Sequence, residues 1–276
     1  MGSESLVSLR QIQKKYGMNE VLKGVDMDVY RGDVYGLIGM NGAGKTTLFK
    51  IILGLSESNG GTISIFGGQS EKQNRAGRRN IGFFVGANFF EYLSGRDNLD
   101  YFRRVKGIKD KKEVDRVLKI VHLDGPAAEK KAGSYSLGMK QRLGIANSLL
   151  GNPEMLIMDE PTNGLDPQGI ADVRNLITKL NEEEGKTILV SSHILGELEH
   201  TAHRFGIVHE GVIMQELGSE ELQTKSGLSL LQIADEDVSK AKKVLEENGI
   251  NVSDVKKDAS SLEDFYFNMV GGGRNA

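Results

Sequence analysis

Apolar and polar positions in the first third of the chain follow strand-like patterns on both sides of one helix-like segment. Short apolar or alternating runs predict strands at Leu6–Ile12, Val21–Tyr30, Asp33–Ile38, 60–68 and Ile81–Val85. After the third run, a glycine-rich turn leads into helical spacing from about Gly44 to Leu53. This part of the chain is therefore predicted to be mostly β, with one helix.

The middle of the chain has a helical pattern from about Gly95 to about Leu150. We expect breaks in it near Gly107 and between Gly125 and Ser134. The charged run RRVKGIKDKKEVDRVLK in this block is typical of a solvated helix face. These features predict a helical insertion subdomain over about residues 87–150.

Strands and helices alternate again after this block. Apolar runs predict strands at 155–159 and 186–192, a hairpin over 204–217 that turns at Glu210–Gly211, and helices at 167–183 and 193–204. Pro167 suits the first turn of the first of these helices. Such alternation is typical of a mostly parallel sheet covered by helices, so the predicted fold class is α/β.

A different pattern follows the hairpin, and we place a domain boundary between residues 218 and 219. The remaining segment has a β-α-β-α pattern, with elements expected at 228–234, 237–249, 250–257 and 261–270. We therefore expect residues 1–218 to form the main domain and residues 219–276 to form a small α+β appendage.

Composition limits the classes of function. The 276 residues are 38% hydrophobic and 26% charged, which is enough for a sizeable core. A formal net charge of -3 argues against a dedicated nucleic-acid binder, and the lack of cysteine excludes disulfides and Cys-based metal sites. No apolar run approaches the roughly 18 residues of a membrane span, and the first residues lack the order of a signal peptide. We expect a cytoplasmic chain that meets a membrane only through a partner.

The segment GMNGAGKTT has the chemistry of a phosphate-binding loop. Gly39-x-x-x-x-Gly44-Lys45-Thr46 fits that pattern and lies between a predicted strand and a predicted helix. Backbone N–H groups can wrap a polyphosphate only where side chains stay out of the way, and the helix N-terminus points at the same anion. Lys45 would bring positive charge to the β- and γ-phosphates, and the Thr46 hydroxyl would ligate Mg²⁺. The nucleotide-binding candidates are Gly39, Met40, Asn41, Gly42, Ala43, Gly44, Lys45, Thr46 and Thr47.

Two carboxylates, Asp159 and Glu160, end the apolar run MLIMDE. The end of a strand beside a phosphate-binding loop is where a second Mg²⁺ ligand belongs, and Asp159 suits this role. Glu160 projects differently and would polarise a water aimed at the γ-phosphate. On its own, an acidic pair of this kind can also simply begin a solvated loop.

Two further sites follow from helix and strand ends. Ser136 and Gly138 place a hydroxyl and bare backbone at the start of a helix, which suits either a second anion site or an ordinary serine N-cap. A second phosphate site makes sense if two copies of the chain face each other across the nucleotide. His193 follows a predicted strand, at the edge where α/β sheets bind ligands.

Taken in order, these motifs resemble the nucleotide-binding domain of ABC transporters, over about Val7–Leu217. Gly39–Thr46 is similar to Walker A, MLIMDE to Walker B with the catalytic glutamate, and YSLGMKQR to the family signature LSGGQ. NGLD, which ends at Asp166, is similar to the D-loop. His193 is similar to the switch histidine, and Tyr16 lies where the family places an aromatic ring under adenine. Several segments resemble the ATPases of bacitracin-resistance and lantibiotic-immunity exporters.

The resemblance implies a P-loop NTPase core with an N-terminal antiparallel β subdomain, acting on ATP with Mg²⁺. It implies catalytic roles for Glu160 and His193, and metal ligation by Thr46 and Asp159. A second ATP-binding subunit, identical or related, would contribute its signature residues Ser136, Gly138 and Met139 and its D-loop Asp166. A separate transmembrane permease would dock on the helical block, which places the chain on the inner face of the membrane.

One departure from the family concerns Gly86. After the strand IGFFV the family expects Gln or Glu, and this segment also looks one residue short. Asn88 can substitute, or the coupling is weaker, or this copy is specialised. Changing Gly86 to Gln should be tolerated unless the residue has a positive φ, in which case it is strained.

Two other functions fit parts of the sequence. A soluble ABC-type ATPase would contain tandem domains in one chain, or one domain split by a long coiled coil. This chain has one set of motifs and no sustained heptads. A regulatory module that binds ATP without turnover is supported by Gly86 alone and opposed by Glu160 and His193. Steady-state ATPase activity separates these alternatives.

Overall fold

The structure is a computed structural model that describes residues 4–86, 89–199, 201–219, 221, 231, 233–250 and 252. The chain divides into two units, residues 1–221 and 222–276. The predicted boundary after residue 218 stays a prediction. All of the residues singled out above for chemistry lie in the first unit.

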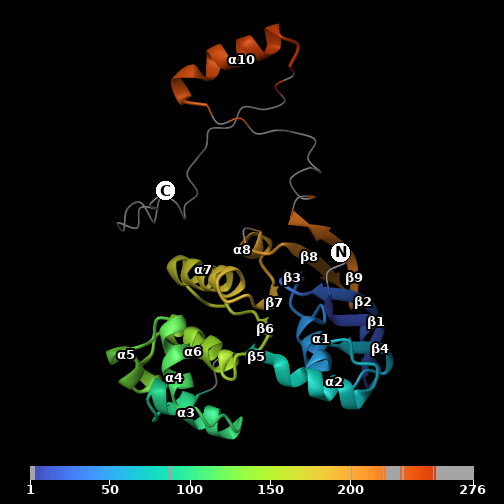
Figure 1. Ribbon diagram of the computed structural model, residues 1–276. Helices are drawn as coiled ribbons and strands as arrows, with labels where there is room; N and C mark the ends of the chain where they lie inside the picture. The colour runs from blue at the N-terminus through green and yellow to red at the C-terminus, as the bar shows by residue number, and fades with distance from the viewer. Residues whose placement is uncertain are drawn as a thin grey trace. The chain divides into compact units, whose positions relative to one another are not determined.

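A six-stranded sheet runs through the first unit in the order β5-β6-β7-β3-β8-β9 (Figure 1). Its strands are β3 (Val34–Ile38), β5 (Ile81–Val85), β6 (Met155–Asp159), β7 (Thr187–Ser192), β8 (Arg204–His209) and β9 (Val212–Gly218). The first five strands of this order are parallel, and β9 pairs antiparallel with β8. Every residue of β3 and β7 is buried, as continuous apolar runs in a covered parallel sheet require.

A three-stranded antiparallel sheet, in the order β2-β1-β4, packs against this core. Its strands are β1 (Ser5–Tyr16), β2 (Asn19–Tyr30) and β4 (Gly60–Ile65). β1 is longer than predicted because its polar end still pairs with β2, with Lys15 opposite Glu20. The α/β class and the antiparallel N-terminal sheet are both confirmed.

Four helices lie close to the two sheets: α1 (Lys45–Ile52), α2 (Glu71–Gly77), α7 (Pro167–Glu182) and α8 (Leu195–Leu198). Helix α2 is not predicted from the sequence, because it buries Asn74 and Gly77 rather than an apolar stripe. The Asn74 amide binds β4, accepting from Ile65 N at 2.9 Å and donating to Ile63 O at 2.9 Å. A single turn of 3₁₀ helix, η1 (Arg78–Asn80), then leads into β5.

The helix predicted over 193–204 is wrong in length, because α8 has only four residues. The chain must return to the sheet at β8, and His203 N already donates to Val34 O at 2.8 Å. A continued helix would keep its N–H groups for its own carbonyls and lose this contact with β3. The segment after α8 is therefore a turn.

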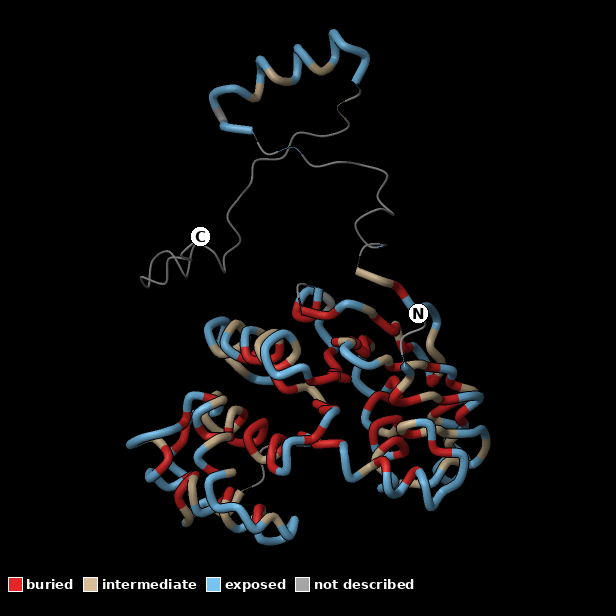
Figure 2. The backbone as a smooth tube through the Cα atoms, viewed as in Figure 1, coloured by how far each residue is buried: buried red, intermediate tan, exposed pale blue. Residues whose placement is uncertain are grey.

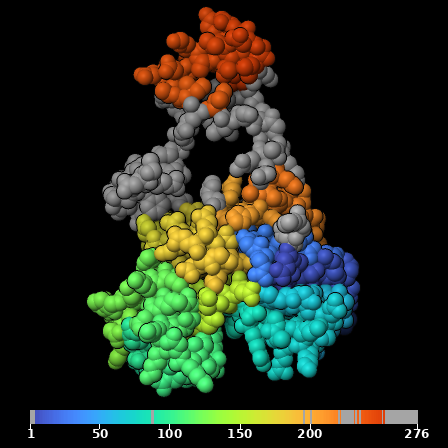
Figure 3. All heavy atoms as spheres, viewed as in Figure 1, coloured from blue at the N-terminus to red at the C-terminus, as the bar shows by residue number. Residues whose placement is uncertain are grey.

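The predicted helical insertion is a block of four helices and a short 3₁₀ turn: α3 (Gly95–Val105), α4 (Lys112–Ile120), α5 (Pro126–Glu129), η2 (Ala132–Ser134) and α6 (Leu137–Leu149). The breaks fall where expected, with Gly107 at φ +73° and Gly125 at φ +61°. In Figure 3 the atoms of this block gather in a green lobe, and the antiparallel sheet with α1 and α2 forms a blue to cyan lobe.

Two apolar clusters lie on opposite faces of the six-stranded sheet, and each of the five parallel strands contributes residues to both clusters. In β6, Leu156 and Met158 pack with the helical block and α7, whereas Met155 and Ile157 pack with α1 and the antiparallel sheet. Figure 2 shows these buried segments in red along the strands and the inner helix faces. The clusters hold the carboxyl ends of β3, β6 and β7 at one edge.

In the second unit, η3 (Asp235–Asp237) and α10 (Val238–Glu247) occupy the predicted helix at 237–249. The described residues of the strand predicted at 228–234 are Leu231, Ile233 and Ala234, and none of them is in a strand. Ile250 and Val252 are likewise outside any strand. The rest of the predicted strands, and the helix predicted at 261–270, lie outside the described residues.

Candidate active site

The loop predicted to bind phosphate joins β3 to α1, where the sequence places it. Two of its glycines are required, each for a different structural reason. A Cβ on Gly39 would lie 2.5 Å from Val208 O in β8, so this position needs bare backbone for packing. Gly44 has φ +109°, and a Cβ there would lie 2.7 Å from Leu22 Cδ2. The loop can therefore keep this course only with glycine at both positions.

The N-terminus of α1 is open to an anion. Gly44 takes the N-cap position without a side-chain cap, and the first turn contains no acidic residue. The first N–H groups of a helix have no partner within the helix, so an anion bound there satisfies them. Asn41, Gly42 and Thr46 are exposed at this end, while Ala43 is buried and Thr47 half-buried.

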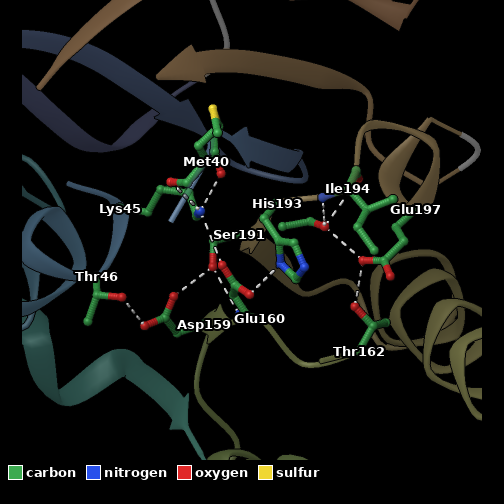
Figure 4. Close-up of polar contacts among 12 residues, drawn as sticks. Met40, Lys45, Thr46, Asp159, Glu160, Thr162, Ser191, His193, Ile194 and Glu197 are labelled. Carbon is green, nitrogen blue, oxygen red and sulfur yellow. Dashed lines mark hydrogen bonds and ion pairs between the residues drawn. The ribbon is translucent and has the colours of Figure 1, made fainter. Parts of the chain in front are cut away.

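The Lys45 side chain is only 5% exposed and lies against the loop and Glu160 (Figure 4). Its Nζ donates to the carbonyl oxygens of Gly39 and Met40 and lies 3.1 Å from Glu160 Oε1. A nucleotide phosphate at the N-terminus of α1 would compete with Glu160 for this ammonium. The lysine therefore contacts both the loop between β3 and α1 and the carboxylate that follows β6.

Asp159 ends β6 and connects two neighbouring strands. Its Oδ2 accepts from Thr46 Oγ1 at 2.6 Å, and its Oδ1 accepts from Ser191 Oγ at 2.7 Å. Asp159 and Ser191 are opposite each other in the parallel register of β6 and β7. This register holds the carboxylate against the start of α1.

Thr46 and Asp159 fit Mg²⁺ by the chemistry of their oxygens. Mg²⁺ is bound in nucleotide sites by one or two protein oxygens together with phosphates and waters. Among the described residues, no group of three or more His, Cys, Asp or Glu side chains forms a metal cluster. A magnesium ion at Thr46 and Asp159 would therefore depend on the phosphates of the nucleotide for its remaining ligands.

Glu160 directly follows β6 with φ 48°, in the left-handed region that few non-glycine residues adopt. Its N–H donates to Ser191 Oγ at 2.9 Å, and its carbonyl accepts from Asn163 N at 3.1 Å, which closes a turn. The turned backbone directs its carboxylate between Lys45 and His193, whose Nδ1 lies 2.6 Å from Glu160 Oε2. Strained backbone of this kind is concentrated at functional sites.

Tyr16 is half-exposed at the end of β1, and its hydroxyl lies 3.5 Å from Ser56 Oγ. This contact and the nearby Lys14 ammonium lower the pKa of the Tyr16 phenol below its ordinary value. Lys14 Nζ lies 4.9 Å from the centre of the Tyr16 ring. An adenine base could stack on Tyr16 only on the opposite ring face, or after Lys14 moves.

The signature and D-loop candidates do not reach this site within the chain. Ser136 caps α6, and its Oγ accepts from Met139 N at 3.3 Å. A Cβ on Gly138 would lie 3.8 Å from Leu165 Cδ2, which places the start of α6 beside the D-loop segment. Asp166 is the N-cap of α7 and accepts from Gly169 N at 2.8 Å. In Figure 1, α6 belongs to the helical block, whereas α1 lies with the two sheets.

Gly86 follows β5 with φ +72°, and a Cβ there would meet nothing within 4 Å. The space is open, but the backbone conformation disfavours any residue with a side chain. Tolerance of Gln is expected only without a positive φ. Because φ is positive, the other expected case applies, in which Gln at this position is strained. Asn88 lies outside the described residues.

Four polar residues around the site are not predicted from the sequence: Thr162, Ser191, Ser192 and Glu197. Glu197 Oε2 accepts from Thr162 Oγ1 and from Ser192 Oγ, both at 2.7 Å (Figure 4). The two serines could have been recognised as hydroxyls that end a predicted strand directly before His193. Nothing in the sequence signals that Glu197 is buried.

Comparison with known proteins shows the family of the chain. The family model described as ABC transporter matches residues 22–163. A bacitracin transport ATP-binding protein of Bacillus licheniformis is 37% identical, over 98% of this chain and 98% of its own. A lantibiotic transport ATP-binding protein of Streptococcus pyogenes is 41% identical, over 79% of this chain and 94% of its own. These matches cover the site and most of the fold.

A solved structure shows the same fold in a nucleotide-bound protein. The dimeric ATP-binding cassette MJ0796, in a post-hydrolysis state bound to ADP and phosphate, matches with a TM-score of 0.68 and 27% identity. The match covers 77% of this chain and 98% of that one. The chain therefore belongs to the ABC transporter family, as an ATP-binding subunit, and it is an ATPase. None of the described helices has the length and apolar character of a membrane span.

Proposed function

We propose that this chain hydrolyses Mg-ATP at the site formed by the β3–α1 loop and the ends of β6 and β7, and thereby powers a membrane exporter. One observation carries the proposal for the site. The Glu160 carboxylate lies between Lys45 and His193, one residue from the carboxylate that contacts Thr46. This arrangement provides a positive charge for the γ-phosphate, oxygens for a metal ion and a carboxylate for the attacking water, all around one point.

Each residue has a distinct part in the proposed reaction. The N-terminus of α1 and Lys45 bind the phosphates, while Thr46 and Asp159 hold Mg²⁺, which offsets the negative charge of the phosphates when bound. Glu160 orients and polarises the attacking water, and His193 holds the Glu160 carboxylate through its Nδ1. Phosphoryl transfer to water is mostly a matter of position and charge, so these fixed contacts supply most of the catalysis.

A dimer completes the site in this proposal. Ser136, Gly138 and Met139 lie at the start of α6, away from α1 of the same chain. A second copy, or a related subunit, would present this helix start to the γ-phosphate, with Asp166 of the adjoining turn nearby. The dimeric arrangement of the MJ0796 cassette supports this proposal.

The partner in the membrane is a separate permease, which we place on the helical block. Aromatic rings gather where this block begins: Phe90 lies 5.0 Å from Tyr101, centre to centre, and Tyr92 is 70% exposed. Relatives named for bacitracin and lantibiotic transport favour an antimicrobial peptide as the exported substrate. The chain would then lie peripherally on the inner face of the membrane.

The rate of phosphate release tests the site. Glu160→Gln keeps the shape of the side chain and removes its negative charge, so we expect ATP binding to persist and turnover to fall by at least about a hundredfold. Glu182→Gln, at the exposed end of α7, serves as the matched control and should release phosphate at the parental rate. Normal turnover in Glu160→Gln would remove Glu160 from the mechanism.

A further inference from the structure

A buried carboxylate that the proposed reaction does not use lies next to the site. Glu197 in α8 is 8% exposed. Its Oε2 accepts two hydroxyl hydrogen bonds of 2.7 Å, from Thr162 and from Ser192. Glu197 takes part in none of the salt bridges found between described residues. A buried charge is costly unless hydrogen bonds compensate it, so these two hydroxyls determine where the side chain can lie.

The two hydroxyls belong to the two turns that carry the proposed catalytic residues. Thr162 follows Glu160 by two residues, within the turn that the Asn163 N–H closes on the Glu160 carbonyl. Ser192 directly precedes His193, and its Oγ accepts from Ile194 N at 3.0 Å, which closes a serine turn around His193. One carboxylate oxygen thus joins the turn after β6 to the end of β7 (Figure 4).

The two turns are also joined at their bases, where Ser191 Oγ accepts from Glu160 N at 2.9 Å, and Glu197 adds a second link further along each turn. Glu160 is in the left-handed region, a conformation that persists only where its surroundings hold it. The contact between Glu160 Oε2 and His193 Nδ1 depends on both turns at once, because Glu160 begins one turn and His193 lies within the other. A shift of either turn would separate the pair.

We propose that Glu197 is a positioning residue for ATP hydrolysis: through Thr162 and Ser192 it holds the turn of Glu160 against the turn of His193. This inference rests on the proposed roles of Glu160 and His193. Glu197 does not touch the nucleotide site itself, and it acts on turnover rather than on nucleotide binding.

Steady-state kinetics of Glu197→Ala and Glu197→Gln tests the inference. Glu197→Ala leaves both hydroxyls without their acceptor, so kcat should fall by about tenfold to a hundredfold, the range that a small misplacement of catalytic groups produces. KM for Mg-ATP should stay within about twofold, because the α1 loop is unchanged. Glu197→Gln keeps a carbonyl oxygen that can accept both hydroxyls, so it should retain most of the parental kcat.

Three controls separate positioning from general loosening of the fold. Glu199→Ala removes an exposed carboxylate two residues away and should leave kcat unchanged. Leu198→Ala loosens the packing of α8 but keeps the hydroxyl links, so it should lower the melting temperature with a smaller loss of kcat. Thr162→Val removes one of the two links without touching Glu197, and it should also lower kcat at constant KM, even if Glu197→Ala fails to fold.

The outcomes distinguish the inference from the function on which it rests. If Glu160→Gln is inactive but Glu197→Ala and Thr162→Val turn over at the parental kcat, the inference is overturned and the proposed site stands. Equal losses of kcat in Leu198→Ala and Glu197→Ala would also overturn it, as would a loss that appears in KM. If Glu160→Gln turns over normally, the proposed site fails and the positioning role fails with it.

Discussion

The Glu160 carboxylate lies 2.6 Å from Nδ1 of His193, although the two residues are 33 positions apart in the sequence. They meet because β6 and β7 are parallel neighbours whose carboxyl ends share one edge of the sheet. Lys45 reaches the same carboxylate from β3 and α1, on the far side of β7 from β6. The geometry of the site is therefore set by strand order and register.

Lys45→Ala should weaken ATP binding by at least about tenfold, because a charge-assisted contact to phosphate contributes roughly 1.5 to 3 kcal/mol. The measurement is a titration of the purified chain with Mg-ATP, followed by calorimetry or a fluorescent analogue. Lys72→Ala, an exposed lysine on α2, is the control and should bind as the parent does. An unchanged dissociation constant in Lys45→Ala would mean that the loop does not bind the phosphates.

Gly86→Gln should destabilise the protein by about 1 kcal/mol, because its φ of +72° is unfavourable for a residue with a Cβ. Gly107→Gln is a matched control for the backbone effect, since Gly107 has φ +73° and open space around it. Melting curves should show similar shifts for both variants, roughly 2 to 4 °C for each kcal/mol. A Gly86→Gln protein as stable as the parent would contradict this account of the backbone.

Gly86→Asn tests the missing side chain without the same strain, because Asn is enriched in the left-handed region. If the absent side chain limits the geometry of the water or the metal ion, Gly86→Asn hydrolyses ATP faster than the parent. A barrier lower by about 1.4 kcal/mol gives a tenfold gain in rate at saturating Mg-ATP. No gain in a protein of parental stability would show that Gly86 is not a catalytic deficit.

Glu113 gives a pH-dependent prediction for the helical block. It accepts from Arg116 Nη2 and from Gly151 N, both at 2.8 Å, and the Arg116 hydrogen bond lowers the pKa of its carboxyl. A carboxyl with a lowered pKa stabilises the fold above its ordinary value of 4.5, and this contribution is lost as the pH falls below that value. Glu113→Gln should therefore cost about 1 to 2 kcal/mol at pH 7 and distinctly less near pH 3.5.

Urea unfolding of the parent and Glu113→Gln at both pH values measures this difference. Glu57→Gln, at an exposed position outside the helical block, should show almost no difference at either pH. A Glu113→Gln effect that stays the same size at low pH would show that the ionised carboxylate is not the source of the stabilisation.

Much of the fold follows from patterns in the sequence because each strand of the core has a simple environment. β3 and β7 are buried on both faces, so their apolar runs predict strands directly. The short α8 could not be predicted, because its end depends on the contact of His203 with Val34 in a distant strand. Helix α2 has no apolar stripe to predict it, because its buried side consists of Asn74 and Gly77.

The residues of the site also fall into those that the sequence predicts and those that it does not. The loop at Gly39–Thr46 and the carboxylates at the end of β6 depend on local sequence, and the sequence predicts them. The partners Ser191 and Glu197 depend on register and on the course of the chain after β7. Ser191 can be recognised only as a hydroxyl near the end of a predicted strand, and its partners cannot be predicted. Spacing along the sequence contains no information on Glu197, so this residue could be found only in the structure.

The central claim is that Glu160 drives hydrolysis of an ATP held between two subunits. Light scattering on Glu160→Gln, with Mg-ATP or Mg-ADP, tests it most directly. We predict twice the chain mass of 30.2 kDa with Mg-ATP and the single-chain mass with Mg-ADP. A variant that binds Mg-ATP at parental affinity but keeps the single-chain mass, or that releases phosphate at the parental rate, would contradict the claim.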